Sequence, residues 1–585
     1  MISRATRDRF IFIGAFVGCI AAFFIVLGWL PGSLWDNPIA ADDAAGHYYM
    51  ARKLYDNGWS SLLSLSVDDS FYPPLFSAMT VIVMKLGASI TAATAVAWLI
   101  GAGVFFPFAM AALASWICRK QAHRVRVLVA TGTPILASLI PGHPYTQLAT
   151  GPLLAYGLAQ SLLPALLLAF LVLLHTVTGL LDKTGKPSSL IWPVAAVILL
   201  GCAEMAAQPR IVFAFIVVVF PFVVQWLIRL GTAHLKFLLA VVVSTVVLGL
   251  VAVIVVVRQA AAMHPGESID NPGGWFELYK PNHTILTGIA FSLTGGCVGC
   301  DDSGLVSATI LAAVVVVLAV LCFRASWTRG LASSWLLAGF LVYICASVPG
   351  PLGNLLTAVW YREEHRIVSM VVVPLILVAV CGMAELARVA TASRGRRVLA
   401  ALLPLVFLAS LLANPQRMTL SQVVRDKSAP AQAEPASMVT QYKLDAFSQM
   451  GTVVPQQGLV FADPYTGFGY AYGMDDIAAF YPVGNLWPTR ERRMVEADFG
   501  SGDPDRMTNR LCTVMPGYGD RFVADFGAPY RDDYDHFKYY ASFRDRGLIA
   551  SYVAHDALTL VGEYPSGQDH PFALYQVMCG ARIHR

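Results

Sequence analysis

The residues best suited to acid–base chemistry are a carboxylate and an imidazole four positions apart. Asp43 and His47 lie in the segment ADDAAGH, shortly after an apolar run at residues 11–30. On a helix this spacing puts both side chains on one face, where the carboxylate can orient the imidazole or share a substrate with it. Asp42 can assist the pair or simply cap the helix, because Asp is a favoured N-cap residue. We therefore expect a functional pair at Asp43 and His47.

A second cluster combines aromatic and cationic residues in the segment AVWYREEHRIVSM, just before another apolar run. Arg362, His365 and Arg366 form a candidate phosphate clamp, because arginine binds planar anionic oxygens through two hydrogen bonds. Trp360 and Tyr361 are candidates for substrate contact. The alternative is an ordinary membrane interface, where aromatic residues and snorkelling arginines are common.

Two isolated residues complete the candidate set. Tyr72 belongs to FYPPLF, in which the prolines make a stiff lead-in to a helix beginning near Leu75. Its ring could stack on a sugar or face a lipid headgroup. Arg210 stands between two apolar runs, and we add it to the candidate phosphate-binding residues.

The composition requires a membrane to position these residues. Of the 585 residues, 56% are hydrophobic and 13% are charged, whereas soluble domains carry about 25% charged residues. Runs of about 20 apolar residues predict about eleven spanning helices in a mainly α, polytopic bundle. We interpret the first run as an uncleaved helix, since it is longer than the apolar part of a signal peptide. The predicted spans are 9–30, 88–117, 124–141, 158–181, 189–207, 210–229, 236–258, 303–323, 331–349, 366–387 and 397–414.

Loop charge predicts the orientation. Lys and Arg concentrate at alternate ends of the spans, so the positive-inside rule puts the N-terminus in the cytoplasm. The first loop, 31–87, and everything after 415 are then outside. There Cys297 and Cys300 favour a small-loop disulfide over a redox or metal site, and Cys512 with Cys579 is a further candidate pair.

The tail has a different composition from the rest of the chain, with more charge and shorter apolar runs. We divide the chain into a transmembrane domain, 1–414, and a small extracytoplasmic α/β domain, 415–585. In the tail the pattern predicts an amphipathic helix and four strands. The helix is expected at 437–450 and the strands at 458–464, 512–516, 521–527 and 574–583.

These motifs resemble the C-type glycosyltransferase superfamily, polytopic enzymes that use polyprenyl-phosphate-linked sugars. More closely, the chain is similar to an uncharacterised actinobacterial membrane family placed near them. The matching segments are DAAGH, YPP, WYREEHR and DPYTGFGYAYG, which are short and spread over most of the chain. Phe468 departs from the pattern, because a small residue is expected at that position of the last segment.

The resemblance implies an inverting transfer from a polyprenyl-phosphate sugar to a cell-envelope glycan or glycolipid at the plasma membrane. Asp43 would be the general base, and His47 would orient it or bind the donor phosphate. Arg362 or Arg366 would neutralise the departing phosphate. No cofactor is required, although Asp42 could hold Mg²⁺ or Mn²⁺. Membrane lipids are expected partners and nucleic acid is not.

Three other functions remain open at this stage. A lipid or lipid-linked glycan transporter would place ionisable groups near the bilayer midplane, but Glu204, Arg210 and Glu385 lie toward helix ends. A glycan polymerase or ligase would rely on arginine and histidine without the first-loop aspartate. A scaffold with a sensor domain would leave the Asp43–His47 pair unused.

Overall fold

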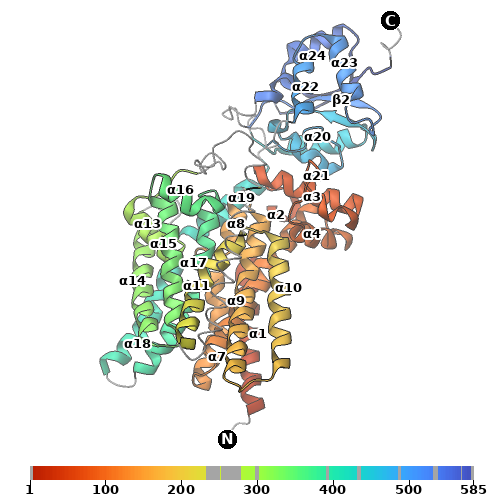
Figure 1. The fold of residues 1–585 in the computed structure, drawn as a ribbon. Helices are drawn as coiled ribbons and strands as arrows, with labels where there is room; N and C mark the ends of the chain where they lie inside the picture. The colour runs from red at the N-terminus through yellow and green to blue at the C-terminus, as the bar shows by residue number, and fades with distance from the viewer. Residues whose placement is uncertain are drawn as a thin grey trace. The chain divides into compact units, whose positions relative to one another are not determined.

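The computed structural model divides the chain into two compact units. Unit 1 comprises Met1–Leu30 and Trp98–Ser421, and unit 2 comprises Pro31–Ala97 and Gln422–Arg585. The predicted C-x-x-C cysteines, Cys297 and Cys300, and almost all of the predicted span 236–258 lie outside the described residues. The described residues are 4–231, 251, 258, 279–296, 302–390, 394–430, 437–484, 489–530, 538–567 and 569–580 (Figure 1).

The described part of the chain contains nine helical segments long and apolar enough to cross a membrane. This confirms a multi-pass membrane protein built mainly from α-helices. The helices of these segments are α1 (Arg4–Leu27), α5 (Ile90–Leu99) with α6 (Phe106–Ile117), α9 (Leu154–Leu181), α10 (Ile191–Ala207), α11 (Ile211–Leu230), α14 (Asp302–Arg324), α15 (Arg329–Ser347), α17 (Glu364–Val389) and α18 (Arg394–Ala413) with α19 (Gln416–Ser428).

One further predicted span forms a shorter helix. The run at 124–141 is α7 (His123–Leu139), which has 17 residues and contains Pro134. It packs against α1 and α6 within unit 1. The short helices α8 (Tyr145–Ala149), α13 (Ile285–Thr294) and α16 (Pro351–Thr357) complete the named helices of this unit.

Helix α17 forms the centre of unit 1. It contacts α7, α11, α14 and α15 (Figure 1), and nearly all of its residues from Ile367 to Leu386 are buried. This position suits a helix that is apolar on all sides, because the neighbouring helices cover its faces. The start of α17, which carries the WYREEHR motif, is therefore held by the best-packed element of the unit.

Unit 2 joins the segment Pro31–Ala97 to the C-terminal segment. The first contributes α2 (Ser33–Asp36), α3 (Asp42–Asn57) and α4 (Leu75–Lys85), and the second contributes all of the sheet (Figure 1). The sheet order is β1-β2-β4-β3, with β1 parallel to β2 and the other pairs antiparallel. The helices and strands of the C-terminal segment are α20 (Gln441–Gly451), β1 (Leu459–Phe461), α21 (Ala471–Asp475), α22 (Arg490–Phe499), α23 (Pro504–Thr513), β2 (Arg521–Asp525), α24 (Arg546–Ala554), β3 (Leu558–Tyr564) and β4 (Phe572–Val577).

Most of the predicted tail elements are confirmed. Helix α20 and strands β1, β2 and β4 fall within the predicted ranges or overlap them. The predicted strand 512–516 is wrong: Cys512 and Thr513 end α23. The carbonyls of Val514 and Met515 instead accept hydrogen bonds from the buried Arg521 guanidinium. Strand β3 was not predicted, because its central residues are mostly exposed.

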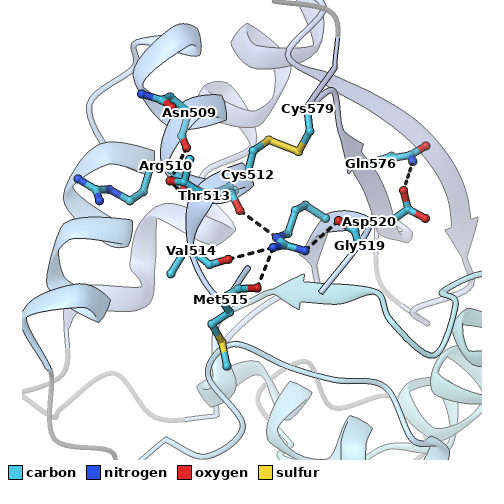
Figure 2. The surroundings of a disulfide bond; sticks show 12 residues. Asn509, Arg510, Cys512, Thr513, Val514, Met515, Gly519, Asp520, Gln576 and Cys579 are labelled. Atoms are coloured by element: carbon cyan, nitrogen blue, oxygen red, sulfur yellow. Dashed lines mark hydrogen bonds between the residues drawn. A yellow bond between two sulfur atoms is a disulfide. The ribbon is translucent and has the colours of Figure 1, made fainter. Parts of the chain in front are cut away.

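The predicted cysteine pair forms a disulfide. Cys512 at the end of α23 is bonded to Cys579 after β4, with a Cα–Cα distance of 5.6 Å (Figure 2). Arg521 also donates to the carbonyls of Leu511 and Gly519. The disulfide and this arginine fix the loop between α23 and β2 to the sheet.

The sequence predicts a domain boundary at residue 414, and this boundary stays a prediction. Unit 2 takes its C-terminal part from Gln422 onward and also includes Pro31–Ala97. The loop that carries Asp43 thus packs with the C-terminal α/β fold.

Candidate functional site

Helix α3, which carries Asp43 and His47, is fixed at its start by two tyrosines. The N-cap position is Ala41, so Asp42 is the first helical residue and its predicted capping position is wrong by one residue. The Tyr48 hydroxyl accepts a hydrogen bond from the Ile39 N–H at 3.1 Å. The Tyr470 hydroxyl accepts one from the Ala41 N–H at 2.9 Å and lies 2.7 Å from the Ile39 carbonyl.

Tyr470 belongs to DPYTGFGYAYG, so two of the sequence motifs meet inside unit 2. Gly473 of the same motif packs on α3 so closely that a Cβ atom there would lie 2.7 Å from the Cβ of Tyr48. Near the other end of α3, the Tyr472 hydroxyl donates to Asp56 at 3.0 Å. Phe468 is buried and packs edge-on against Phe447 and Phe526, which accounts for a large residue at that position. The motif therefore holds α3 along most of its length.

The Asp43–His47 pair has an asymmetric environment. Asp43 is half-buried, whereas His47 is only 6% exposed and meets the rings of Tyr72 and Phe76 at 6.1 and 5.7 Å. The His47 Nδ1 atom has no hydrogen-bond partner among the described residues. Burial lowers the pKa of His47 to about 4, so the imidazole is neutral at pH 7. Tyr72 is half-buried and packs edge-on against this imidazole, and its contact with a sugar or headgroup stays a prediction.

The start of α17 is organised by Glu363. Its carboxylate caps the helix by accepting from the N–H groups of His365 and Arg366, and it also bonds His365 Nδ1 at 2.6 Å. Burial raises the pKa of Glu363, but the bond from His365 and the charges of His365 and Arg366 outweigh this effect and hold it below its usual range. The Tyr156 hydroxyl donates to the Arg366 carbonyl at 2.9 Å and Gln147 donates to the His365 carbonyl.

Two arginines converge on the ring of Tyr361. The guanidinium carbons of Arg210 and Arg366 lie 3.9 and 5.0 Å from the ring centroid, and Arg210 also donates to the Tyr361 hydroxyl. The Arg366 guanidinium makes no hydrogen bond or ion pair with any residue that the structure describes. It is half-buried, and the nearby Glu363 is already bonded to His365. This arrangement concentrates positive charge at one place in unit 1.

The backbone at this point is strained. Tyr361 and Arg362 both have positive φ values, 58° and 54°, which non-glycine residues seldom adopt. Strain of this kind persists where surrounding contacts enforce it, and it is concentrated at functional sites. Here it lies at the residue whose ring contacts both guanidinium groups.

Arg362 differs from its neighbours in the motif. Its guanidinium is directed to Asn354 and to the carbonyls of Cys345 and Val348, and only 4% of the residue is exposed. These bonds fasten the end of α15 to the segment before α17. We therefore assign Arg362 a structural role instead of the expected phosphate binding, because it is buried and three of its five N–H donors are bonded within the fold.

Two other candidates also have structural contacts. Trp360 is buried and packs edge-on against Phe213 of α11 at 6.2 Å, so it is part of the core of unit 1. His365 is held by Glu363, and the adjacent Glu364 pairs in the same way with His283 at 3.1 Å. Each of these acids has a histidine partner, which leaves the arginine pair as the cluster's anion-attracting feature.

Sequence reasoning included neither Glu204 nor Tyr470 among the candidate site residues. Glu204 of α10 is fully buried, and neither carboxylate oxygen has a hydrogen-bond partner within the described chain. Its apolar surroundings were visible in the sequence, but its burial was not. Tyr470 was inside a recognised motif, yet its contact with α3 depends on residues about 430 positions away.

The predicted site residues fall into both units. Asp43, His47 and Tyr72 belong to unit 2, and Arg210, Tyr361 and Arg366 belong to unit 1. Among the described residues, no three His, Cys, Asp or Glu side chains gather in a way that could hold a metal ion. We therefore assign no ligand set to the Mg²⁺ or Mn²⁺ that the sequence allowed.

With this geometry in hand, the chain can be compared with known proteins. A family described as "Family of unknown function (DUF6541)" matches residues 3–575. The chain belongs to this family. No curated protein matches it.

Two solved structures are similar over most of the chain. One is ArnT from Cupriavidus metallidurans in the apo state, with 10% identity and a TM-score of 0.49, covering 96% of this chain and 97% of the other. The second is the Archaeoglobus fulgidus oligosaccharyltransferase in the apo form, with 11% identity and a TM-score of 0.47, covering 89% and 70%.

Proposed function

We propose that this family member is a membrane glycosyltransferase that moves a sugar from a polyprenyl-phosphate donor to an extracytoplasmic acceptor hydroxyl, with inversion. The observation that carries the proposal is the pair Arg210 and Arg366 on the ring of Tyr361. The half-buried guanidinium of Arg366 has no acidic hydrogen-bond partner among the described residues, which favours an anionic ligand. The sequence motifs supply the glycosyltransferase class, and Asp43 supplies a base.

Arg366 binds the donor phosphate in this proposal. A guanidinium presents two parallel N–H groups that match two phosphate oxygens, and such bonds are about twice as strong as neutral ones. Tyr361 keeps the two arginines near each other by cation–π contact. Arg210 adds a second positive charge, which stabilises the phosphate as it leaves.

Asp43 acts as the general base. The acceptor oxygen attacks the anomeric carbon while the bond from that carbon to the phosphate oxygen breaks. Asp43 takes the proton of the acceptor hydroxyl, and the polyprenyl phosphate leaves with the electron pair. A single displacement of this kind inverts the anomeric centre.

Of the two roles expected for His47, orienting Asp43 and binding the donor phosphate, we propose the first. As a neutral imidazole packed against Tyr72 and Phe76, it does not supply charge to a phosphate. We assign it to positioning the first turns of α3, together with Tyr470. Asp43 then has a fixed backbone and a half-exposed side chain, which suits a group that must meet a substrate.

Two features support the compartment in this proposal. The Cys512–Cys579 disulfide fits an oxidising environment for unit 2. The positive charges of alternate loops support an orientation in which the first loop and the tail are on the same outer side of the plasma membrane. The substrate would be a lipid-anchored sugar whose headgroup is presented on that side.

The test is transfer from radiolabelled polyprenyl-phosphate sugars to membrane acceptors by the purified full chain. Asp43→Asn removes the base while nearly preserving volume, and we expect transfer to fall by about 10²–10⁴-fold, the usual contribution of a general base. Arg366→Ala should raise the donor KM. Asp445→Asn, an exposed aspartate of α20, is the matched control and should leave transfer unchanged.

Two outcomes would contradict the proposal. If Asp43→Asn transfers sugar at the wild-type rate, the base is wrongly assigned. If the wild-type chain in liposomes moves a lipid-linked sugar between leaflets without transferring it, the chain is a transporter.

A further inference from the structure

Unit 2 encloses a second site, away from Asp43. A cavity of about 430 Å³ lies between the C-terminal half of α3, the loop after it, and the C-terminal α/β fold. This volume is within the range of roughly 300–1,000 Å³ that ligand sites usually have. Every lining residue belongs to unit 2.

One wall of the cavity is a single stripe of α3. Tyr49, Lys53 and Asn57 are spaced four apart, so they share one face of the helix. The other walls include Tyr472 of α21 and Tyr518 of the loop after α23. The cavity therefore exists only when the segment Pro31–Ala97 and the tail are folded together.

Three tyrosines contribute to the lining, Tyr49, Tyr472 and Tyr518. The rings of Tyr49 and Tyr472 lie 5.1 Å apart, and Tyr472 is held in place by Asp56. Tyr518 faces the same space and is close enough to Tyr49 to influence its ionisation. The hydroxyls of Tyr49 and Tyr518 have no hydrogen-bond partner in the described part of the chain, so both can bond a ligand.

The charges around the cavity are mixed and partly neutralised. Lys53 is buried and bonds Asp69 at 2.6 Å and the Ser66 carbonyl at 2.7 Å. Asp68 accepts two hydrogen bonds from Ser70, which lower its pKa and keep it ionised. With Glu491 and Arg492 included, acids outnumber bases by three to two. A phosphorylated ligand would be repelled, whereas a neutral polyhydroxyl compound would find donors and acceptors on every side.

The rim of the cavity is rigid. Asp69 and Met515 both line it and both have positive φ values, 58° and 50°. The Met515 carbonyl is bonded to Arg521, and the Cys512–Cys579 disulfide lies beside the same loop (Figure 2). A preformed cavity loses little conformational entropy when a ligand binds.

We propose that this cavity binds a neutral saccharide. The apolar C–H face of a sugar ring packs on the tyrosine rings, while its hydroxyls bond Asn57, Asp68 and the free tyrosine hydroxyls. Tyr49 stands on a different face of α3 from Asp43, about 9 Å further along the helix axis. Resting on the proposed function, the cavity would hold a sugar unit of the acceptor glycan while another unit reaches the base.

The experiment is saturation-transfer NMR on the full chain in detergent, without donor. The probes are neutral trisaccharides of glucose, mannose, galactose and arabinose, with inorganic phosphate as the anionic comparison. We expect at least one trisaccharide to bind saturably and phosphate not to compete with it. Tyr518→Ala should weaken binding about tenfold, as expected for losing one ring contact.

Variants separate binding from folding. Asn57→Ala changes an exposed residue of the rim and should weaken binding about threefold with an unchanged Tm. Tyr442→Ala alters a tyrosine of α20 that does not line the cavity, so it should bind as the wild type does. The proposal is overturned if no trisaccharide binds saturably, or if both Tyr518→Ala and Asn57→Ala bind like the wild type.

This result is independent of the transfer assay. Saccharide binding with no transfer activity would reject the proposed function and leave the cavity assignment standing. Transfer that depends on Asp43 without any saccharide binding would support the proposed function and reject the cavity assignment. If both hold, Asn57→Ala should raise the acceptor KM with little change in kcat.

Discussion

The starts of α3 and α17 are built alike and differ in what they leave exposed. In each, a tyrosine hydroxyl from a distant element bonds the backbone: Tyr470 at α3 and Tyr156 at α17. At α3 the histidine of the motif is buried among rings while Asp43 is half-exposed. Near the start of α17, Arg362 is buried, whereas Arg366 is half-buried.

The difference shows how a motif divides its residues between structure and chemistry. In both motifs one ionisable residue is buried and another, four positions away, is half-buried. On α3 that spacing puts the two residues on one face, whereas Arg362 lies before the N-cap of α17 and has a positive φ. The spacing alone therefore does not say which residue faces the interior. Each member of a motif therefore needs its own test.

Replacing the two arginines of the motif should give the largest contrast. Arg362→Ala removes the partner of one amide oxygen and two carbonyls, and we expect it to lower the free energy of unfolding by about 4 kcal/mol. Arg366→Ala should lower it by less than about 1 kcal/mol. Denaturation of the detergent-solubilised chain measures both. Equal losses would mean that Arg366 is also structural.

The pH dependence of stability should reveal His47. Its folded pKa of about 4 lies below the unfolded value of about 6.5, so the unfolded state binds the proton first. The stabilisation is complete above pH 6.5 and is lost as the pH falls to 4, by about 3 kcal/mol. His47→Phe keeps an aromatic ring and should remove this part of the slope. A slope unchanged in His47→Phe would show that His47 is not buried as a neutral group.

Tyr470→Phe should loosen the start of α3. It leaves the Ala41 N–H without its partner, and we expect a loss of about 2 kcal/mol. Hydrogen exchange should accelerate at Ala41 and in the first turn of α3. Tyr442→Phe, which changes a partly exposed tyrosine of α20, is the control. Unchanged exchange at Ala41 would remove Tyr470 from its positioning role.

Tyr156→Phe should have the smallest effect. The Arg366 carbonyl keeps a second hydrogen bond, from Ser369 at 2.6 Å, so we expect a loss of about 1 kcal/mol. Comparing this variant with Tyr470→Phe tests whether α17 is held by its own packing. A larger loss for Tyr156→Phe would reverse the order of the two helix starts.

The sequence predicts most of the helical fold because apolar runs report directly on membrane spans. It also predicts helix α3 and places Asp43 and His47 on it. It could not predict that Arg362 bonds Cys345 and Val348, because those carbonyls belong to residues without any charge pattern. The sequence could not predict the proposed saccharide cavity either, because lining residues such as Tyr49 and Tyr518 are more than 400 positions apart.

Unit 2 is interrupted by the whole of Trp98–Ser421, and this has a consequence for biosynthesis. The segment Pro31–Ala97 emerges from the ribosome long before Tyr470 and Gly473 are made. Until the last part of the chain is made, α3 lacks the surface it packs on, and its buried Tyr48 is exposed. Native pairing is thus delayed to the end of synthesis, and a chain that stops early would present this unpaired helix to quality-control proteases.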